Sequence, residues 1–336
     1  MSQQQVKILV LRFSSIGDIV LTSPVLRNLK KSLKEVELHY LTKTAFADLL
    51  LHNPNVDKLW SFNKDISEVL PSLLSEKFDY VVDLHKNLRT LRLKKKLKVK
   101  SFSFDKLNVD KFLLTKLKIN RMPSVHIVDR YLACVQELGV SNDREGLDYF
   151  TNPESEINFL ETAKQLPDKY TVVVMGAAHF TKVPTIQKYR EILKAVNKPF
   201  VLIGGDKDFE KAKEIAQNLN VSTLNYCGKT TLDTSALIIK HAELVITPDT
   251  GMMHVASAYK VPVVSLWGNT VPEFGMTPYY GKYKVPFLLA EVKKLSCRPC
   301  SKIGYESCPK KHFKCTEELD VSQIQTWVTE TSVSLL

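Results

Sequence analysis

Several features that would identify a protein class are missing from this sequence. No apolar run reaches the ~18 residues that a membrane-spanning helix needs. The first residues, MSQQQVKILVLRF, do not show a basic segment, an apolar stretch and a small-residue cleavage site in that order. The loop after this first apolar run contains neither G-x-G-x-x-G nor G-x-x-x-x-G-K-[ST]. We therefore expect a protein that is made and kept in the cytosol, without a dinucleotide fingerprint or a P-loop.

The composition is that of an ordinary globular protein. Hydrophobic residues make up 44% and charged residues 25% of the 336 residues. This balance excludes a disordered chain, a collagen and a disulfide-rich miniprotein. Since a domain has roughly 100–200 residues, the length favours two domains.

Positive charge is concentrated in one stretch. The chain has 47 Lys and Arg against 36 Asp and Glu, a net charge of +11, and residues 86–121 alone hold thirteen basic and two acidic residues. Such a stretch suits nucleic acid, anionic lipid or a phosphorylated acceptor, or it is simply a solvated helix face. We expect no nucleic acid, because the aromatics of the stretch are only Phe102, Phe104 and Phe112 and no RNA-binding motif accompanies them.

Apolar strands alternate with amphipathic helices along the whole chain. Strands are predicted at 6–13, 36–42, 56–62 and 78–84, and again at 170–177, 199–205, 243–249 and 261–268. This alternation predicts an α/β fold with parallel sheets. Residues 141–153 are polar and turn-rich, so we place a domain boundary there. The prediction is two Rossmann-like domains, 1–150 and 151–320, facing a central cleft, with ligands beyond the carboxyl ends of the strands.

The segment Thr247-Pro248-Asp249-Thr250-Gly251-Met252-Met253-His254 joins a predicted strand to a helix. The free N–H groups of a first helical turn and the helix dipole make an anion site. Gly251 permits close approach of a ligand, and His254 falls in the same turn. The alternative is a plain capping turn in which Asp249 or Thr250 caps the helix.

Other charged residues follow predicted strands. Asp18 ends the loop after the first strand and is either a general base or a helix-start residue. Lys182 follows strand 170–177 and is either a phosphate ligand or a surface lysine. Asp206 follows Gly204-Gly205 and either binds ribose hydroxyls or starts the next helix.

These motifs together resemble the lipopolysaccharide heptosyltransferases, glycosyltransferase family 9. The resemblance rests on Arg12-Phe13-Ser14-Ser15-Ile16-Gly17-Asp18 with Thr22-Ser23-Pro24, on Asp83-Leu84-His85-Lys86-Asn87-Leu88-Arg89, and on Asp249-Thr250-Gly251-Met252-Met253-His254-Val255-Ala256. It implies a GT-B architecture in which a C-terminal helix, 321–336, packs back on the first domain. It also implies inverting transfer from a nucleotide-sugar, ADP-heptose in the best-known members.

The resemblance also implies roles for single residues. Asp18 takes the position of the catalytic base, and the implied donor-binding residues are Thr181, Lys182, Asp206, Asp249, Thr250, Gly251 and His254. One carboxylate base suffices for a single displacement, and cations can stabilise the departing diphosphate. We see no acidic pair of the DxD type in the donor region, so we expect no catalytic metal.

The basic stretch then has a candidate partner. Arg89, Arg92, Lys94, Lys95 and Lys96 could meet a phosphorylated glycolipid acceptor or the anionic inner face of the cytoplasmic membrane. Leu88, Leu91, Leu93 and Leu97 lie between these charges and either enter the interface or form the core face of the helix.

Four cysteines crowd near the C-terminus: Cys297, Cys300, Cys308 and Cys315, in the spacing C-x2-C-x7-C-x6-C, with His312 inside. In a cytosolic protein such a cluster is compatible with a structural zinc held by four thiolates, or by three and His312. Two local disulfides or free thiols remain alternatives.

The function expected from the sequence is therefore a metal-independent, membrane-associated glycosyltransferase that moves heptose from ADP-heptose to a lipopolysaccharide core. One alternative keeps the fold but changes the nucleotide-sugar or uses a protein acceptor. A remote alternative is a protein that binds anionic polymers or lipids and carries a vestigial sugar site.

Overall fold

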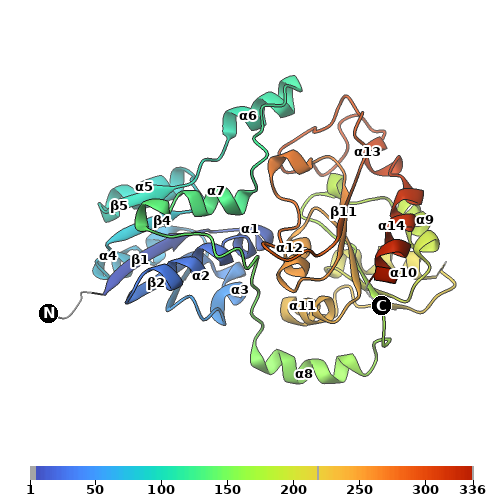
Figure 1. The fold of residues 1–336 in the computed structure, drawn as a ribbon, viewed down its shortest axis with the longest axis horizontal. Coiled ribbons are helices and arrows are strands. Elements are labelled where there is room, and N and C mark those ends of the chain that lie inside the picture. The colour runs from blue at the N-terminus through green and yellow to red at the C-terminus, as the bar shows by residue number, and fades with distance from the viewer. Residues whose placement is uncertain (1–4, 218, 335–336) are drawn as a thin grey trace. The chain divides into compact units, whose positions relative to one another are not determined.

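The computed structural model describes residues 5–217 and 219–334 and divides into two compact units. The first unit contains Met1–Lys106 and Val125–Asn152, and the second contains Leu107–Ser124 and Pro153–Leu336. The chain passes from one unit to the other at Asn152 and Pro153, inside the turn-rich segment that the sequence marks as a boundary (Figure 1).

The first unit is a parallel sheet of five strands in the order β3-β2-β1-β4-β5. Its strands are β1 Val6–Leu11, β2 Val36–Lys43, β3 Lys58–Phe62, β4 Tyr80–Asp83 and β5 Lys100–Ser103. Its helices are α1 Ile16–Val20, α2 Ser23–Ser32, α3 Asp48–Leu51, α4 Leu70–Ser75, α5 Leu88–Leu97 and α7 Ile127–Ala133. The buried residues of β1 read as a continuous apolar run because helices cover both faces of such a sheet.

The second unit is a parallel sheet of six strands in the order β11-β10-β9-β6-β7-β8. Its strands are β6 Thr171–Val174, β7 Phe200–Ile203, β8 Thr223–Asn225, β9 Leu244–Pro248, β10 Val263–Trp267 and β11 Phe287–Glu291. Its helices are α6 Asn108–Phe112, α8 Pro153–Ala163, α9 Ile186–Val196, α10 Phe209–Ala216, α11 Leu232–Lys240, α12 Gly251–Ala258, α13 Lys314–Glu317 and α14 Val321–Ser334. Each sheet is the centre of its own apolar core.

Residues 107–124 belong to the second unit, in contrast to the predicted first domain of 1–150. After α6 the chain continues as a π-helix, Leu113–Leu117, whose Leu114 is buried against Val271 and Phe274. Lys118 then donates to the carbonyl oxygens of Cys297 and Pro299, at 3.1 and 2.7 Å. These apolar and polar contacts attach the insertion to the second unit.

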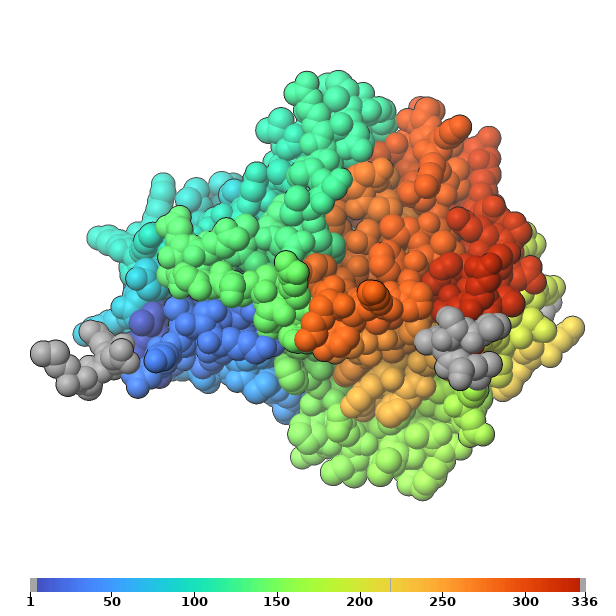
Figure 2. All heavy atoms as spheres, viewed as in Figure 1, coloured from blue at the N-terminus to red at the C-terminus, as the bar shows by residue number. Residues whose placement is uncertain are grey.

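The C-terminal helix α14 packs on the core of the second unit. Ile324 and Val328 of α14 are 0% and 2% exposed and join the core cluster of the second unit, and α14 packs along α9. Figure 2 shows the outer side of this helix, in red, at the surface of that unit. The apolar face of α14 is therefore covered within the second unit, while packing of this helix on the first domain stays a prediction.

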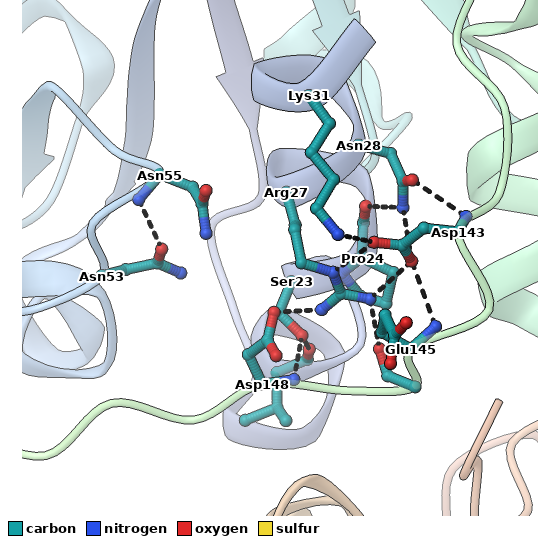
Figure 3. Close-up of polar contacts among 12 residues, drawn as sticks. Ser23, Pro24, Arg27, Asn28, Lys31, Asn53, Asn55, Asp143, Glu145 and Asp148 are labelled. Atoms are coloured by element: carbon teal, nitrogen blue, oxygen red, sulfur yellow. Dashed lines mark hydrogen bonds and ion pairs between the residues drawn. The ribbon is translucent and has the colours of Figure 1, made fainter. Parts of the chain in front are cut away.

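Arg27 of α2 binds the last segment of the first unit, residues 143–148. Its side chain, 11% exposed, pairs with Asp143 and Asp148 and donates to the carbonyl of Gly146. Ser23 is the first residue of α2, and its hydroxyl accepts the backbone N–H of Asp148 at 2.9 Å. Figure 3 shows the carboxylates of Asp143 and Asp148 pointing toward the Arg27 guanidinium.

Replacing Arg27 by Met should destabilise the first unit by about 3 kcal/mol, because two half-buried carboxylates lose their common partner. Burial alone would raise the pKa of Asp143, but Arg27 and Lys31 outweigh it and hold that pKa well below its usual range. This contribution is therefore complete above the ordinary carboxyl pKa of about 3.9 and is lost as the pH falls from there through the lowered pKa. Urea unfolding of the two proteins between pH 7 and pH 2 measures both effects.

Lys31→Met is the matched control, since Lys31 bonds the same carboxylate from a 54% exposed position. It should cost no more than about 1 kcal/mol, as exposed ion pairs do. An equally small loss for Arg27→Met would contradict the anchoring role.

Candidate active site

Asp18 lies in the first turn of α1, directly after the carboxyl end of β1. Its Oδ2 accepts from the backbone N–H and the hydroxyl of Ser15, at 3.2 and 2.9 Å, which forms a capping box. The Asp18 side chain is 20% exposed, so it is oriented by its own loop but remains accessible. The structure shows Asp18 as a helix-start residue, and its role as a general base stays a prediction.

Arg12 sets the charge state of Asp18. Its guanidinium lies 2.6 Å from Asp18 Oδ1 and is held by the carbonyl of Leu84 at 2.6 Å and the hydroxyl of Tyr131 at 3.1 Å. Burial by itself would raise the pKa of Asp18, but the charge of Arg12 and the hydrogen bonds of Ser15 outweigh it and keep that pKa below its ordinary value. Asp18 is therefore a carboxylate at neutral pH.

Two further titratable groups, His85 and Lys106, lie within electrostatic reach of Arg12 and Asp18. Burial, together with the charges of Arg12 and Lys106, lowers the pKa of His85 to about 4. Burial and Arg12 also lower the pKa of Lys106. The imidazole of His85 is thus neutral at pH 7, with its ring 4.7 Å from that of Phe13.

The basic residues of α5 separate into two groups. Arg92, Lys95 and Lys96 are exposed, and Arg89 is half-buried with its guanidinium 5.7 Å from the centre of the Phe13 ring. Lys94 points inward and pairs with the buried carboxylate of Asp83 at 2.9 Å. Lys94 is therefore not part of the exposed basic surface.

Lys182 and Asp249 form the centre of the second group of candidate residues. Lys182 Nζ lies 2.7 Å from Asp249 Oδ2 and 3.2 Å from its carbonyl oxygen. The hydroxyl of Thr270 donates to the same Asp249 Oδ2 at 2.8 Å. The pair leaves the Lys182 side chain 17% exposed, so its ammonium is fixed in position and still reachable.

The start of α12 lies beside this pair. Thr250 is the N-cap with extended backbone angles, and Gly251 is the first helical residue. The helix places its free N–H groups at the carboxyl end of β9, as an anion site requires. His254 is only 1% exposed, so its imidazole supports the turn from inside the unit and is not at its surface.

Thr181 and Asp206 have different surroundings. Thr181 is buried, and its hydroxyl donates to Asn269 Oδ1 at 3.1 Å. Asp206 is exposed after β7, next to Gly228, whose φ of +69° and closeness to Asp206 leave no room for a side chain. Asp208 rather than Asp206 occupies the space over Gly176 and Gly204, because a Cβ at either glycine would lie less than 3 Å from Asp208 Oδ2.

The structure brings together the loops after β6, β9 and β10, which carry Lys182, Asp249 and Thr270. These strands are neighbours in the sheet, so their carboxyl ends meet at one edge. Sequence analysis missed Thr270 and Asn269 in this group, although both follow a predicted strand. It also missed the contribution of Arg12, which lies directly after β1.

The cysteine segment contains partly organised thiols. All six cysteines of the chain are free thiols in this structure. Cys297 Sγ lies 3.6 Å from His312 Nε2. Burial would raise the pKa of Cys308, but backbone N–H groups of residues 310–313 outweigh it and lower that pKa, which favours a thiolate.

A tight metal-type cluster occurs elsewhere. Within the described residues, only Glu37, His39 and Glu76 have three potential ligand atoms all within 4.8 Å of one another. Lys7 Nζ lies 3.4 Å from the Glu37 carboxylate and 3.0 Å from that of Glu76, so these carboxylates are already paired. We therefore interpret this group as an ion-pair network.

A family model for glycosyltransferase family 9 (heptosyltransferase) matches residues 67–304. The chain belongs to this family. It is 27% identical over 290 residues to lipopolysaccharide heptosyltransferase 1 of Campylobacter coli, with 79% of this chain and 84% of that protein covered. It is 25% identical over 333 residues to lipooligosaccharide heptosyltransferase 2 of Campylobacter jejuni, with 92% and 94% covered. The protein is therefore a glycosyltransferase of the heptosyltransferase class.

Solved structures confirm the fold class. A glycosyltransferase of family 9 from Veillonella parvula superposes with a TM-score of 0.76 at 23% identity and covers 98% of this chain and 99% of that one. The ADP-heptose lipopolysaccharide heptosyltransferase II of E. coli gives a TM-score of 0.71 at 18% identity, with the same coverage. The predicted GT-B class of two parallel α/β sheets is therefore confirmed for this family 9 member.

Proposed function

We propose that this protein transfers a heptose from ADP-heptose to a lipopolysaccharide core acceptor, with inversion at the anomeric carbon. Two arrangements, each within its own unit, support the proposal: a carboxylate kept ionised at Asp18 in the first unit, and the fixed Lys182–Asp249 pair beside a helix start in the second. The names of the relatives, which include heptosyltransferases of lipopolysaccharide and lipooligosaccharide, support the substrate class.

Asp18 supplies the base in the proposed mechanism. The oxygen of an acceptor hydroxyl forms a bond to the anomeric carbon while its proton passes to the Asp18 carboxylate. Attack on the face opposite the leaving group inverts the anomeric centre, so no second carboxylate is needed. Arg12 and Ser15 hold the carboxylate in one orientation during the transfer.

The second unit stabilises the leaving group in this mechanism. As the bond between the anomeric carbon and the diphosphate oxygen breaks, its electron pair leaves with ADP and negative charge grows on the β-phosphate. Lys182 and the first N–H groups of α12 lie at the carboxyl edge of the sheet where this charge would develop. Because these groups supply positive charge, we propose that the reaction needs no catalytic metal.

The proposal is tested by incubating the protein with ADP-heptose and a heptose-deficient core glycolipid, with and without EDTA. We expect release of ADP and equal rates with and without EDTA. By NMR, the anomeric configuration of the transferred heptose should be opposite to that in the donor. GDP- and UDP-sugars serve as donor controls. Transfer only from another nucleotide-sugar, or only to a protein acceptor, would replace the stated substrates within the same fold.

We also propose that α5 faces an anionic membrane surface, where the glycolipid acceptor would be presented. Leu88 and Leu91 are 73% and 45% exposed beside the exposed Arg92, Lys95 and Lys96, whereas Leu93 belongs to the core. Exposed apolar residues among cations suit the boundary of an anionic bilayer. Across the described residues, no helix has the length and apolarity to span a bilayer.

Lys95→Glu combined with Lys96→Glu should weaken binding to phosphatidylglycerol vesicles by more than about thirtyfold. The reason is that each surface lysine contributes roughly 1 kcal/mol near an anionic membrane, and each reversal adds repulsion. Co-sedimentation at physiological salt measures the change. Lys164→Glu with Lys169→Glu, two exposed lysines of the second unit, is the matched control. Equal binding of both double variants, or equal binding to phosphatidylcholine, would argue against this surface.

For the cysteine segment we propose a structural zinc held by Cys297, Cys300, Cys308 and Cys315. The support is the donor chemistry: soft thiols, one of them stabilised as a thiolate by four backbone N–H groups, next to His312. When bound, zinc would cross-link this segment and take no part in the reaction. Elemental analysis of the purified protein should give one zinc per chain, and Cys308→Ser should lose it. A metal-free wild type with six titratable thiols would contradict the proposal.

A further inference from the structure

Arg298 lies between Cys297 and Cys300, and its side chain is only 3% exposed. Nε donates to the carbonyl of Gly268 at 2.7 Å, and Nη2 donates to the carbonyl of Thr270 at 2.8 Å. Nη1 pairs with the Glu291 carboxylate at 2.7 Å. One guanidinium thus joins the cysteine segment, the end of β11 and the loop after β10.

The loop that Arg298 holds leads directly to the candidate donor residues. Thr270 presents its carbonyl to Arg298 and its hydroxyl to Asp249 Oδ2, at 2.8 Å in both cases. Lys182 Nζ contacts the same carboxylate oxygen at 2.7 Å. Arg298 is therefore linked to Asp249 through Thr270, and to Lys182 through Thr270 and Asp249.

A second contact from the same segment holds the loop that carries Lys182. The backbone N–H of Tyr305 donates to the Thr181 hydroxyl at 2.8 Å, and the backbone N–H of Thr181 donates to the Tyr305 carbonyl at 3.1 Å. Thr181 immediately precedes Lys182. These two hydrogen bonds therefore hold the residue before the lysine against residues 295–315.

The loops around Gly268, Thr181 and Gly304 pack closely against one another. A Cβ at Gly268 would lie 2.6 Å from the carbonyl oxygen of Thr181, and a Cβ at Gly304 would lie 2.4 Å from Cβ of His179. Gly304 also has a φ of +127°, which L side chains rarely adopt. The backbone of residues 295–315 is thus pressed against the loop 179–182, which in turn packs on residue 268.

We propose that residues 295–315 form a brace that positions Lys182 and Asp249 for the donor diphosphate, and that Arg298 is its positioning residue. This inference rests on the proposed function, because it needs a nucleotide diphosphate to be bound there. A cationic site that is already ordered binds its ligand without spending interaction energy on ordering side chains.

Arginine is specific to this position for a geometric reason. Its planar guanidinium carries five N–H donors and reaches two carbonyls and a carboxylate at once. Lysine would keep the charge opposite Glu291, but a single ammonium would serve the two carbonyls poorly. Arg298→Lys therefore preserves the buried ion pair while loosening the loop.

The test measures ADP binding to the full chain by calorimetry, together with donor KM, kcat and the melting temperature. Arg298→Lys should raise the ADP dissociation constant roughly tenfold and raise donor KM more than it lowers kcat. Thr270→Val, which removes only the hydroxyl bonded to Asp249, should raise the dissociation constant by a smaller factor and covers the case in which Arg298→Lys does not fold. Arg190→Lys is the matched control. Arg190 of α9 pairs with Glu214 of α10, so this substitution leaves residues 295–315 unchanged.

The outcomes separate the brace from the function on which it rests. Wild-type protein that binds ADP, with folded variants whose dissociation constants stay within about twofold of it, overturns the brace alone. A lower melting temperature with unchanged ADP binding also overturns it, because that pattern belongs to a merely structural contact. Wild-type protein that binds none of ADP, GDP and UDP overturns both the proposed function and the brace.

Discussion

Asp18→Asn should lower turnover by roughly 10²- to 10⁴-fold, the usual contribution of a general base, while ADP binding is retained. The amide is almost the same size as the carboxylate and can still meet Ser15, but it cannot accept the proton of the acceptor hydroxyl. Binding should survive because the residues expected to contact the diphosphate belong to the other unit. Single-turnover kinetics with ADP-heptose and calorimetry with ADP measure the two quantities.

Ser15→Ala is the matched control for Asp18→Asn. It removes one hydrogen bond to the carboxylate but leaves the Arg12 pair at 2.6 Å, so it should cost far less turnover than the amide. Turnover by Asp18→Asn within about threefold of the wild type would remove Asp18 from the mechanism. Loss of ADP binding in this variant would contradict the division of roles between the two units.

The rate should also show no titration of Asp18 between pH 5 and pH 8. A base must be ionised to act, and the Arg12 charge and the Ser15 hydrogen bonds keep the pKa of Asp18 below its ordinary value despite burial. The acidic limb of kcat/KM that belongs to Asp18 therefore lies below about pH 3.9. Arg12→Met removes the opposing charge and should move that limb upward; an unchanged limb would mean that another group is the base.

Lys182→Ala should raise the dissociation constant for ADP about 10- to 100-fold, which corresponds to losing a hydrogen bond to a charged group. Its ammonium is fixed by the Asp249 carboxylate and carbonyl, so little ordering is needed when the diphosphate binds. Removal of Lys182 also leaves the largely buried Asp249 carboxylate without its cation, which adds repulsion toward the phosphates. Calorimetry with ADP measures the change directly.

Lys164→Ala provides the comparison for Lys182→Ala. Lys164 is 69% exposed directly after α8 and pairs with Glu161, so its loss should leave ADP binding unchanged. An ADP dissociation constant for Lys182→Ala equal to that of Lys164→Ala would contradict a phosphate-binding role. The salt dependence of binding should also decrease in Lys182→Ala, because one cation fewer meets the diphosphate.

The central strands of both sheets were predictable because they are buried on both faces. The predicted strands 6–13 and 243–249, for example, appear as β1 Val6–Leu11 and β9 Leu244–Pro248. Sequence analysis missed β5, β8 and β11, which are three of the four edge strands of the two sheets. Edge strands are covered on fewer sides, so their sequences need no continuous apolar run.

Individual candidate residues were predictable from their place after a strand, but their surroundings were not. The pairing of Lys182 with Asp249 spans 67 residues, and the pairing of Lys94 with Asp83 removes one predicted surface cation. The burial of His254 likewise depends on neighbours from other elements. Spacing along the chain carries no information on such contacts, because they depend on how elements distant in sequence pack.

The amino-acid sequence by itself determined the alternation of strands and helices, the parallel α/β class and the loops that carry the candidate residues, since apolar periodicity and strand ends are local properties. Only the tertiary structure decided that residues 107–124 and α14 join the second unit, that Arg12 keeps Asp18 ionised, and that Arg298 reaches the loop after β10. These results depend on burial and on charges brought together from distant segments. Both are properties of the packed chain and have no counterpart in any short stretch of sequence.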